Sequence, residues 1–145
     1  MTIANEFVEI YGCNNLNKLK TLIIGDTVIK VNGFNNCPSI TSVKIGKQVA
    51  EIQGFKQSVV SNFSVGSDNE HFEYSSGCLY KDGITLCRTN NYSSFTVKEG
   101  IVNIQSYAIQ GNLSALNLPS SLKSFDENAI TSSEIKVICF GGNYN

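Results

Sequence analysis

The amino-acid sequence predicts a solenoid of about six coils, with one β-hairpin inserted between two of them. Two apolar patterns indicate this fold class, because each of them returns along the chain at intervals of about 21 residues. The composition agrees: 12 residues are glycine, only 2 are proline, and Asn and Ser are abundant, as in chains with many short strands and turns. With 145 residues and 41% apolar content, residues 1–145 are expected to form a single domain.

The first pattern is an apolar triplet of the form Φ-x-x-Φ-x-Φ, where Φ is an apolar or aromatic residue. It occurs at Leu19/Leu22/Ile24, Ile40/Val43/Ile45, Val60/Phe63/Val65, Tyr92/Phe95/Val97, Leu113/Leu116/Leu118 and Ile135/Ile138/Phe140. Successive triplets begin 21, 20, 32, 21 and 22 residues apart. The last two apolar positions of each triplet alternate with an outward position, which is typical of a short strand with one buried face. We therefore expect one strand per coil, stacked into a parallel sheet on the concave side.

The second pattern, Φ-x-x-Φ-x-x-Φ, follows the first within each coil. It occurs at Phe7/Ile10/Cys13, Val28/Val31/Phe34, Val49/Ile52/Phe55 and Ile101/Ile104/Tyr107, and begins again at Leu122/Phe125. A spacing of three fits irregular or 3₁₀-like turns better than a long helix, so the convex side is predicted to be irregular or 3₁₀. One coil cannot bury its own apolar face, whereas stacked coils bury a continuous core.

The longest interval exceeds one coil by about 11 residues and contains the insertion, over about residues 67–91. Within it, SSGCLYKDGITLCRTN (75–90) has the alternation and the Asp-Gly pair of a β-hairpin. A two-residue turn at Asp-Gly places Cys78 opposite Cys87, close enough for a disulfide. A three-residue loop would remove this pairing, so two reduced cysteines are the alternative.

Charge and composition argue against several classes of function. The net charge is −1 at pH 7 and Lys and Arg form no run, which argues against binding to nucleic acid. No apolar stretch approaches the roughly 20 residues that span a bilayer. The N-terminus MTIANEFVEI lacks the charged and apolar regions of a signal peptide, which leaves the location of the protein open.

The residues that could carry chemistry form no catalytic or metal-binding pattern. The cysteines have no C-x-x-C spacing and the single His71 lies in a polar, turn-rich stretch, so neither a metal nor another cofactor is expected. Cys13 and Cys37 fall on apolar repeat positions and are expected to be buried. Cys139 is expected to face outward on the last strand, without a neighbour that would activate it. The protein is therefore not expected to be an enzyme.

Several segments resemble a known repeat family. LPSSLKSFDENAITSSEIKVICF (118–140) and VKEGIVNIQSYAIQGNLSALNLP (97–119) resemble the BspA-like subclass of leucine-rich repeats. GFNNCPSITSVKI (33–45) matches the F-x-x-C-x-x-L-x-x-L-x-L part of that pattern, with Phe34 and Cys37 in register. GCLYKDGITL resembles an insertion that this subclass often carries. The resemblance thus implies a leucine-rich-repeat solenoid with coils about two residues shorter than usual.

The resemblance also implies a function, namely non-catalytic protein–protein binding. It implies a cell-surface or secreted adhesion-type protein whose partners are host or extracellular-matrix proteins. An intracellular scaffold, or a fragment of a longer repeat array, is the alternative, and a cytoplasmic location stays open. A signal peptide or a longer chain in the native gene would distinguish these interpretations.

The outward face of the concave sheet is the candidate binding surface. Its side chains are mostly small and polar, a composition that suits hydrogen-bonded recognition on a solenoid. The candidate residues are Thr21, Ile23, Ser42, Lys44, Asn62, Ser64, Thr96, Ala115 and Asn117. An ordinary solvated sheet face is the competing interpretation. Ile23 and Val137, near the two ends of these rows, are more apolar and suggest further coils or end-to-end self-association.

Overall fold

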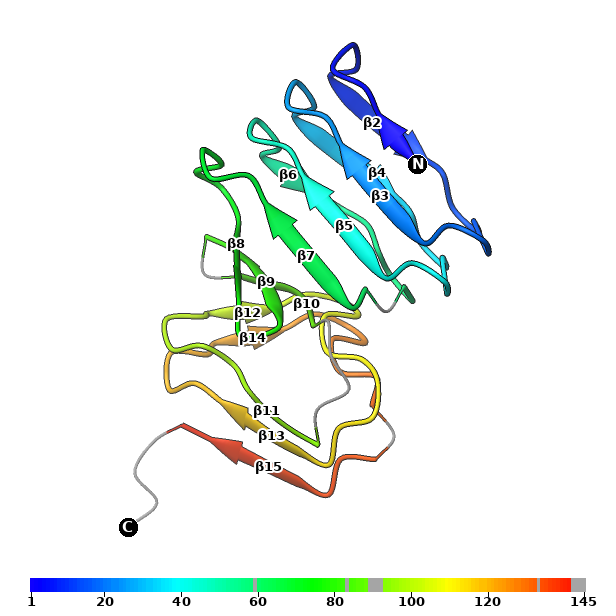
Figure 1. Cartoon of the computed structure of the whole chain (residues 1–145). Helices are drawn as coiled ribbons and strands as arrows, with labels where there is room; N and C mark the ends of the chain where they lie inside the picture. The colour runs from blue at the N-terminus through cyan, green and yellow to red at the C-terminus, as the bar shows by residue number, and fades with distance from the viewer. Residues whose placement is uncertain (59, 83, 89–92, 133, 142–145) are drawn as a thin grey trace.

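The computed structural model describes residues 1–58, 60–82, 84–88, 93–132 and 134–141, with residues 84–88 described by their backbone alone. These residues form a β-solenoid of about six turns with fifteen short strands and no α-helix, which confirms the predicted fold class. Figure 1 shows two stacks of coils joined in the middle by a small antiparallel unit. In this described part of the chain, no helix is long and apolar enough to cross a membrane.

The first apolar pattern forms the parallel sheet of the N-terminal stack. Its strands there are β3 (Thr21–Ile24), β5 (Ser42–Ile45) and β7 (Asn62–Val65), and β1 (Thr2–Ile3), which no predicted triplet contains, pairs with the free side of β3. Neighbouring strands are one coil apart in sequence, so Leu22, Val43 and Phe63 lie side by side. All three side chains are buried, whereas the residues before and after each of them are exposed or half-buried. This alternation is the one predicted from the triplet.

The second triplet forms another parallel sheet of the N-terminal stack. Its strands are β2 (Glu9–Gly12), β4 (Lys30–Gly33) and β6 (Glu51–Ile52). Where an irregular or 3₁₀ path was predicted, the structure combines these short strands with left-handed turn residues. Phe34 and Phe55 have φ angles of 56° and 60°, and their buried rings stack with centroids 5.8 Å apart. A single residue in the left-handed conformation reverses the direction of the chain and ends the strand before it. For this reason the segments with apolar residues three apart form neither a helix nor a longer strand.

The C-terminal stack repeats the arrangement of the first sheet. Its strands are β11 (Ser94–Thr96), β13 (Ala115–Leu118) and β15 (Val137–Phe140). Phe95, Leu116 and Ile138 form one row across them. Among the described strands, β7 and β11 do not pair, so the single sheet expected from the sequence is split in two at the insertion. Tyr92, the first residue of the fourth triplet, lies outside the described residues.

The insertion is antiparallel, as predicted, and has one strand more than a hairpin. β8 (Glu73–Ser75), β9 (Cys78–Lys81) and β10 (Ile84–Arg88) form antiparallel pairs, and β10 continues in parallel to β12 (Asn103–Ile104) and β14 (Ser124–Phe125). The additional turn contains Ser76 and Gly77, whose φ angles of 51° and 78° are those of a tight hairpin turn. Because β10 lies beside β12, it occupies the convex position of one coil.

The register of β9 and β10 differs from the prediction that placed Cys78 opposite Cys87. After Thr85 the pairing shifts by one residue, so that Cys87 faces Leu79 and Cys78 faces Arg88. The extra residue in β10 is a β-bulge, which moves every later pair by one position. The side chain of Cys87 lies outside the described residues, and the disulfide therefore stays a prediction.

β9 joins the cores of the two stacks. Leu79 is 1% exposed and packs in the N-terminal core, whereas Cys78 and Tyr80, at 0% and 3%, pack in the C-terminal core. Successive side chains of a strand point to opposite sides, so one strand placed between the stacks contributes to both. The insertion is therefore the structural junction of the solenoid.

Candidate functional site

The outer strand face, defined as the outward side of β3, β5, β7, β11 and β13, carries every candidate binding residue predicted from the sequence. All of these side chains are exposed or half-buried. Because the sheet is split, the structure brings them together in two groups, one on each stack. The candidate residues therefore lie on two exposed patches and not in one continuous row.

The N-terminal group is ordered in rows that cross the strands. Directly neighbouring residues are Thr21, Ser42 and Asn62 in one row and Ile23, Lys44 and Ser64 in the other. Strands lie about 4.8 Å apart, so each row presents three side chains over about 10 Å. Lys44 is exposed and forms no ion pair with a described residue, and Ile23 beside it is 37% exposed. The group therefore combines a cation, a small apolar surface and hydroxyl groups.

The C-terminal group is smaller and internally hydrogen-bonded. Thr96 and Asn117 are neighbours across β11 and β13, and Asn117 Nδ2 donates to Thr96 Oγ1 at 3.0 Å. Ala115 lies beside Ser94 in the adjacent row and is half-buried. The hydrogen bond holds the amide of Asn117 in one orientation, which makes it a preorganised polar group on this patch.

A cavity of about 510 Å³ lies where the sheet is split, between the β8–β9 turn and β11. Its lining residues are Ser75, Ser76, Gly77, Tyr80, Ser94, Phe95, Thr96 and Lys98. Lys98 Nζ lies 2.5 Å from Glu73 Oε2 and 5.9 Å from the centre of the Tyr80 ring. Burial raises the pKa of Tyr80 far above its usual value, so its phenol stays protonated well into the alkaline range.

Sequence reasoning missed this cavity, because it depends on the pairing of β8 with β9. The Ser-Gly pair before Cys78 was the available signal, since glycine after a polar residue is common in two-residue hairpin turns. The cavity borders the C-terminal group of the outer strand face, since Ser94 and Thr96 belong to its wall as well as to β11.

Two of the three cysteines whose burial or exposure was predicted from the repeat lie as expected, and one does not. Cys37 is buried, as predicted, and its backbone N–H donates to Ser58 Oγ at 2.8 Å. Cys139 is exposed on β15, also as predicted. Cys13 was expected to be buried and is only half-buried, because it lies in the first coil, whose outer side no other described coil covers; Phe34, one coil later and with the same φ of 56°, is buried. In the described part of the chain, no cluster of His, Cys, Asp or Glu could hold a metal ion.

Both end coils expose apolar side chains. On β15, Ile138 and Phe140 are 44% and 53% exposed, although they continue the rows of the buried Leu116 and Leu118. Other exposed apolar residues of the end coils are Met1, Phe7, Val8, Tyr11, Phe125 and Val137. Positions that are buried in an inner coil are thus exposed in the end coils, because no further described coil covers them.

Comparison with known proteins gives a family and a fold. The model of the BspA-type leucine-rich repeat region matches residues 5–81 and 83–145, in six copies. A solved structure, that of a leucine-rich cell surface protein from Faecalibacterium prausnitzii A2-165, is similar with a TM-score of 0.62 and 17% sequence identity. The match covers 86% of this chain and 42% of that protein, so the chain spans about two fifths of its length. No match was found among curated proteins.

Proposed function

This chain belongs to the BspA-type leucine-rich repeat family, and we propose that it is a non-catalytic module that binds other proteins through its outer strand face. The observation that carries the proposal is the ordering of exposed polar side chains in rows across parallel strands. A solenoid holds such rows rigidly, because each coil is fixed by its neighbours. Because the module is already ordered before binding, complex formation carries no additional entropy cost for ordering it.

A cell-surface or secreted location is part of this proposal. It is supported by the resemblance in fold to a protein described as a cell surface protein, of which this chain covers 42%. Host or extracellular-matrix proteins are then the proposed partners. On the N-terminal group, Lys44 would pair with an acidic side chain of the partner, while Ile23 would cover an apolar one.

The test is a binding assay of the purified protein against immobilised extracellular-matrix and host-cell surface proteins. The Lys44→Glu/Asn117→Arg variant changes both groups of the outer strand face. The matched control, Asn17→Arg/Lys18→Glu, introduces the same chemical changes at exposed residues in the turn that follows β2. For a partner that uses the face, we expect at least about a tenfold loss of affinity with the first variant and little change with the control. Equal binding of both variants contradicts the proposal.

End-to-end association, as a scaffold or as part of a longer array, is a second candidate, favoured by the exposed apolar end coils. Phe140 is 53% exposed at a position where Leu118, one coil earlier, is 3% exposed. If two copies stack end to end, Phe140→Glu places a charge in the interface and should return the protein to monomer in sedimentation velocity experiments. A wild-type protein that is monomeric at about 100 µM would argue against self-association of this kind.

A further inference from the structure

The second sheet of the N-terminal stack ends at β6, whose outer edge faces the junction. Glu51 and Gln53 donate their backbone N–H groups toward β4, to the carbonyl oxygens of Ile29 at 3.1 Å and Val31 at 2.8 Å. Backbone groups of successive strand residues point to opposite sides, so those of Ile52 point toward the junction. The sheet order β2-β4-β6 gives β6 no second neighbour among the described strands.

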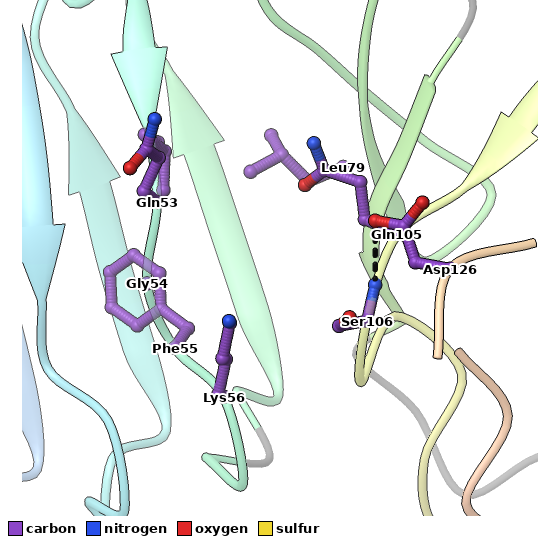
Figure 2. A pocket seen from close by; sticks show the side chains of 9 residues that line it. Gln53, Gly54, Phe55, Lys56, Leu79, Gln105, Ser106 and Asp126 are labelled. Carbon is purple, nitrogen blue, oxygen red and sulfur yellow. Dashed lines mark hydrogen bonds between the residues drawn. The ribbon is translucent and has the colours of Figure 1, made fainter. Parts of the chain in front are cut away.

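A cleft with a volume of about 240 Å³ lies along this edge. One wall consists of the consecutive residues 52–56, and the opposite wall consists of Leu79, Gln105, Ser106 and Asp126. Figure 2 shows Gln53 and Lys56 on the first wall and Asp126 on the second, with Leu79 between them. The carboxylate of Asp126 is held by the backbone N–H of Ser106 at 3.4 Å. An open strand edge beside a cleft is a template for one more strand.

The columns of side chains that run across β2, β4 and β6 specify what an added strand must carry. Glu9, Lys30 and Glu51 alternate in charge, and Lys30 Nζ lies 3.0 Å from Glu51 Oε2. The next position of this column therefore favours a basic residue. The neighbouring column, which contains Val31 and Ile52, is buried, so the next position there favours an aliphatic residue.

The third constraint comes from a column of glycines. A Cβ added to Gly33 would lie 1.7 Å from the carbonyl oxygen of Gly12, and a Cβ added to Gly54 would lie 2.1 Å from that of Gly33. Each coil in this column thus packs directly on the backbone of the preceding one. A strand that continues the sheet past Gly54 in the same register needs glycine at that position as well.

We propose that this cleft binds one extended segment of a partner protein, which adds to β6 as a parallel strand. The segment has the pattern basic–aliphatic–polar–Gly, with the basic residue beside Glu51 and the glycine beside Gly54. β4 itself has this pattern, Lys-Val-Asn-Gly, at residues 30–33. The site lies in the second sheet and goes beyond the proposed function, which concerns the outer strand face.

The test uses the full chain and a fluorescein-labelled synthetic peptide, TVIKVNGFN, which copies residues 27–35. The backbone N–H groups of Glu51 and Gln53 donate toward the preceding strand. The lysine and asparagine of the bound peptide occupy the equivalent positions, so their backbone N–H groups should donate toward β6. An amide-to-ester change at asparagine removes one of these donors, whereas the same change at valine removes an N–H group that points away from β6. We expect the first ester and a glycine-to-alanine peptide each to bind about tenfold more weakly, and the valine ester to bind like the parent.

Two protein variants locate the binding. Gln105→Trp fills the cleft from its far wall and should abolish the anisotropy change, with an unchanged circular dichroism spectrum as the control for folding. Lys44→Glu/Asn117→Arg should leave peptide binding unchanged, since both positions lie on the outer strand face. No binding at about 1 mM peptide, equal affinity of the two esters, or full binding to Gln105→Trp would overturn the proposal.

Discussion

Leu79→Ala is the substitution that tests the role of β9 as a junction most directly. Leu79 is 1% exposed and is the residue of β9 that packs in the N-terminal core, whereas its neighbours Cys78 and Tyr80 pack in the C-terminal core. The side chain can be shortened without changing the strand pairing. The substitution should therefore weaken the packing of β9 on one stack and leave its packing on the other stack intact.

The expected magnitude follows from the burial. Truncating a fully buried leucine to alanine costs about 3 kcal/mol in free energy of unfolding, because transfer energy is lost and a cavity remains. For a domain of this size, this loss corresponds to a fall in melting temperature of about 10 °C. Because a solenoid is stabilised by nearest-neighbour contacts, the loss should fall mainly on the stack that Leu79 contacts.

Amide hydrogen exchange measured by mass spectrometry distinguishes the two stacks. In Leu79→Ala, peptides that contain β3 and β5 should lose protection, while peptides that contain β12 and β13 should retain it. Leu116→Ala, which truncates a fully buried leucine of the C-terminal core, is the matched control and should give the opposite distribution. An equal loss of protection in both stacks of Leu79→Ala would show that residues 1–145 unfold as one cooperative unit and would refute the reasoning that the loss falls mainly on the stack that Leu79 contacts.

Two further predictions concern the stacking of coils. Gly33→Ala should destabilise the protein by about 3 kcal/mol or prevent folding, because the new Cβ would lie 1.7 Å from a backbone oxygen. Gly66→Ala, whose Cβ would meet its nearest atom at 3.5 Å, is the control in the same chemical denaturation experiment. The second prediction concerns Glu99, because hydrogen bonds from Ser120 hold the pKa of its carboxyl group below the usual value. The ionised carboxylate therefore stabilises the fold above a pH of about 4.5. This stabilisation is lost as the pH falls through the lowered pKa. The melting temperature of Glu99→Gln should accordingly fall less than that of the wild type between pH 5 and pH 2; parallel curves would contradict this.

The repeat and its strands were predictable because every coil uses the same physical solution. The positions of Leu22, Val43 and Phe63 are apolar for the same reason, namely that each covers the core of the coil before it. A pattern that recurs in this way is a strong local signal. Phe34 and Phe55 show where the signal becomes ambiguous. Both are apolar residues in left-handed turns, and apolar residues at a spacing of three are also compatible with a helix.

The split of the sheet and the register of the insertion were not predictable from the pattern. Whether β7 pairs with β11 depends on how β9 packs between the stacks, which is a tertiary property. The bulge after Thr85 changes the pairing of Cys78 by one residue, and neither residue type nor spacing encodes this shift. For the same reason, the sequence placed the candidate residues on the outward side of their strands but could not show that they form two groups.

This division of the outer strand face has a consequence for recognition. Lys44 and Asn117 lie in different parallel sheets, so their relative position is fixed by the packing of β9 and not by strand pairing. A partner that touches both groups therefore depends on the junction, whereas a partner that touches one group does not. Leu79→Ala should lower the affinity of the first kind of partner and leave that of the second unchanged. The insertion, although it carries none of the predicted binding residues, would then determine which partners the module can bind.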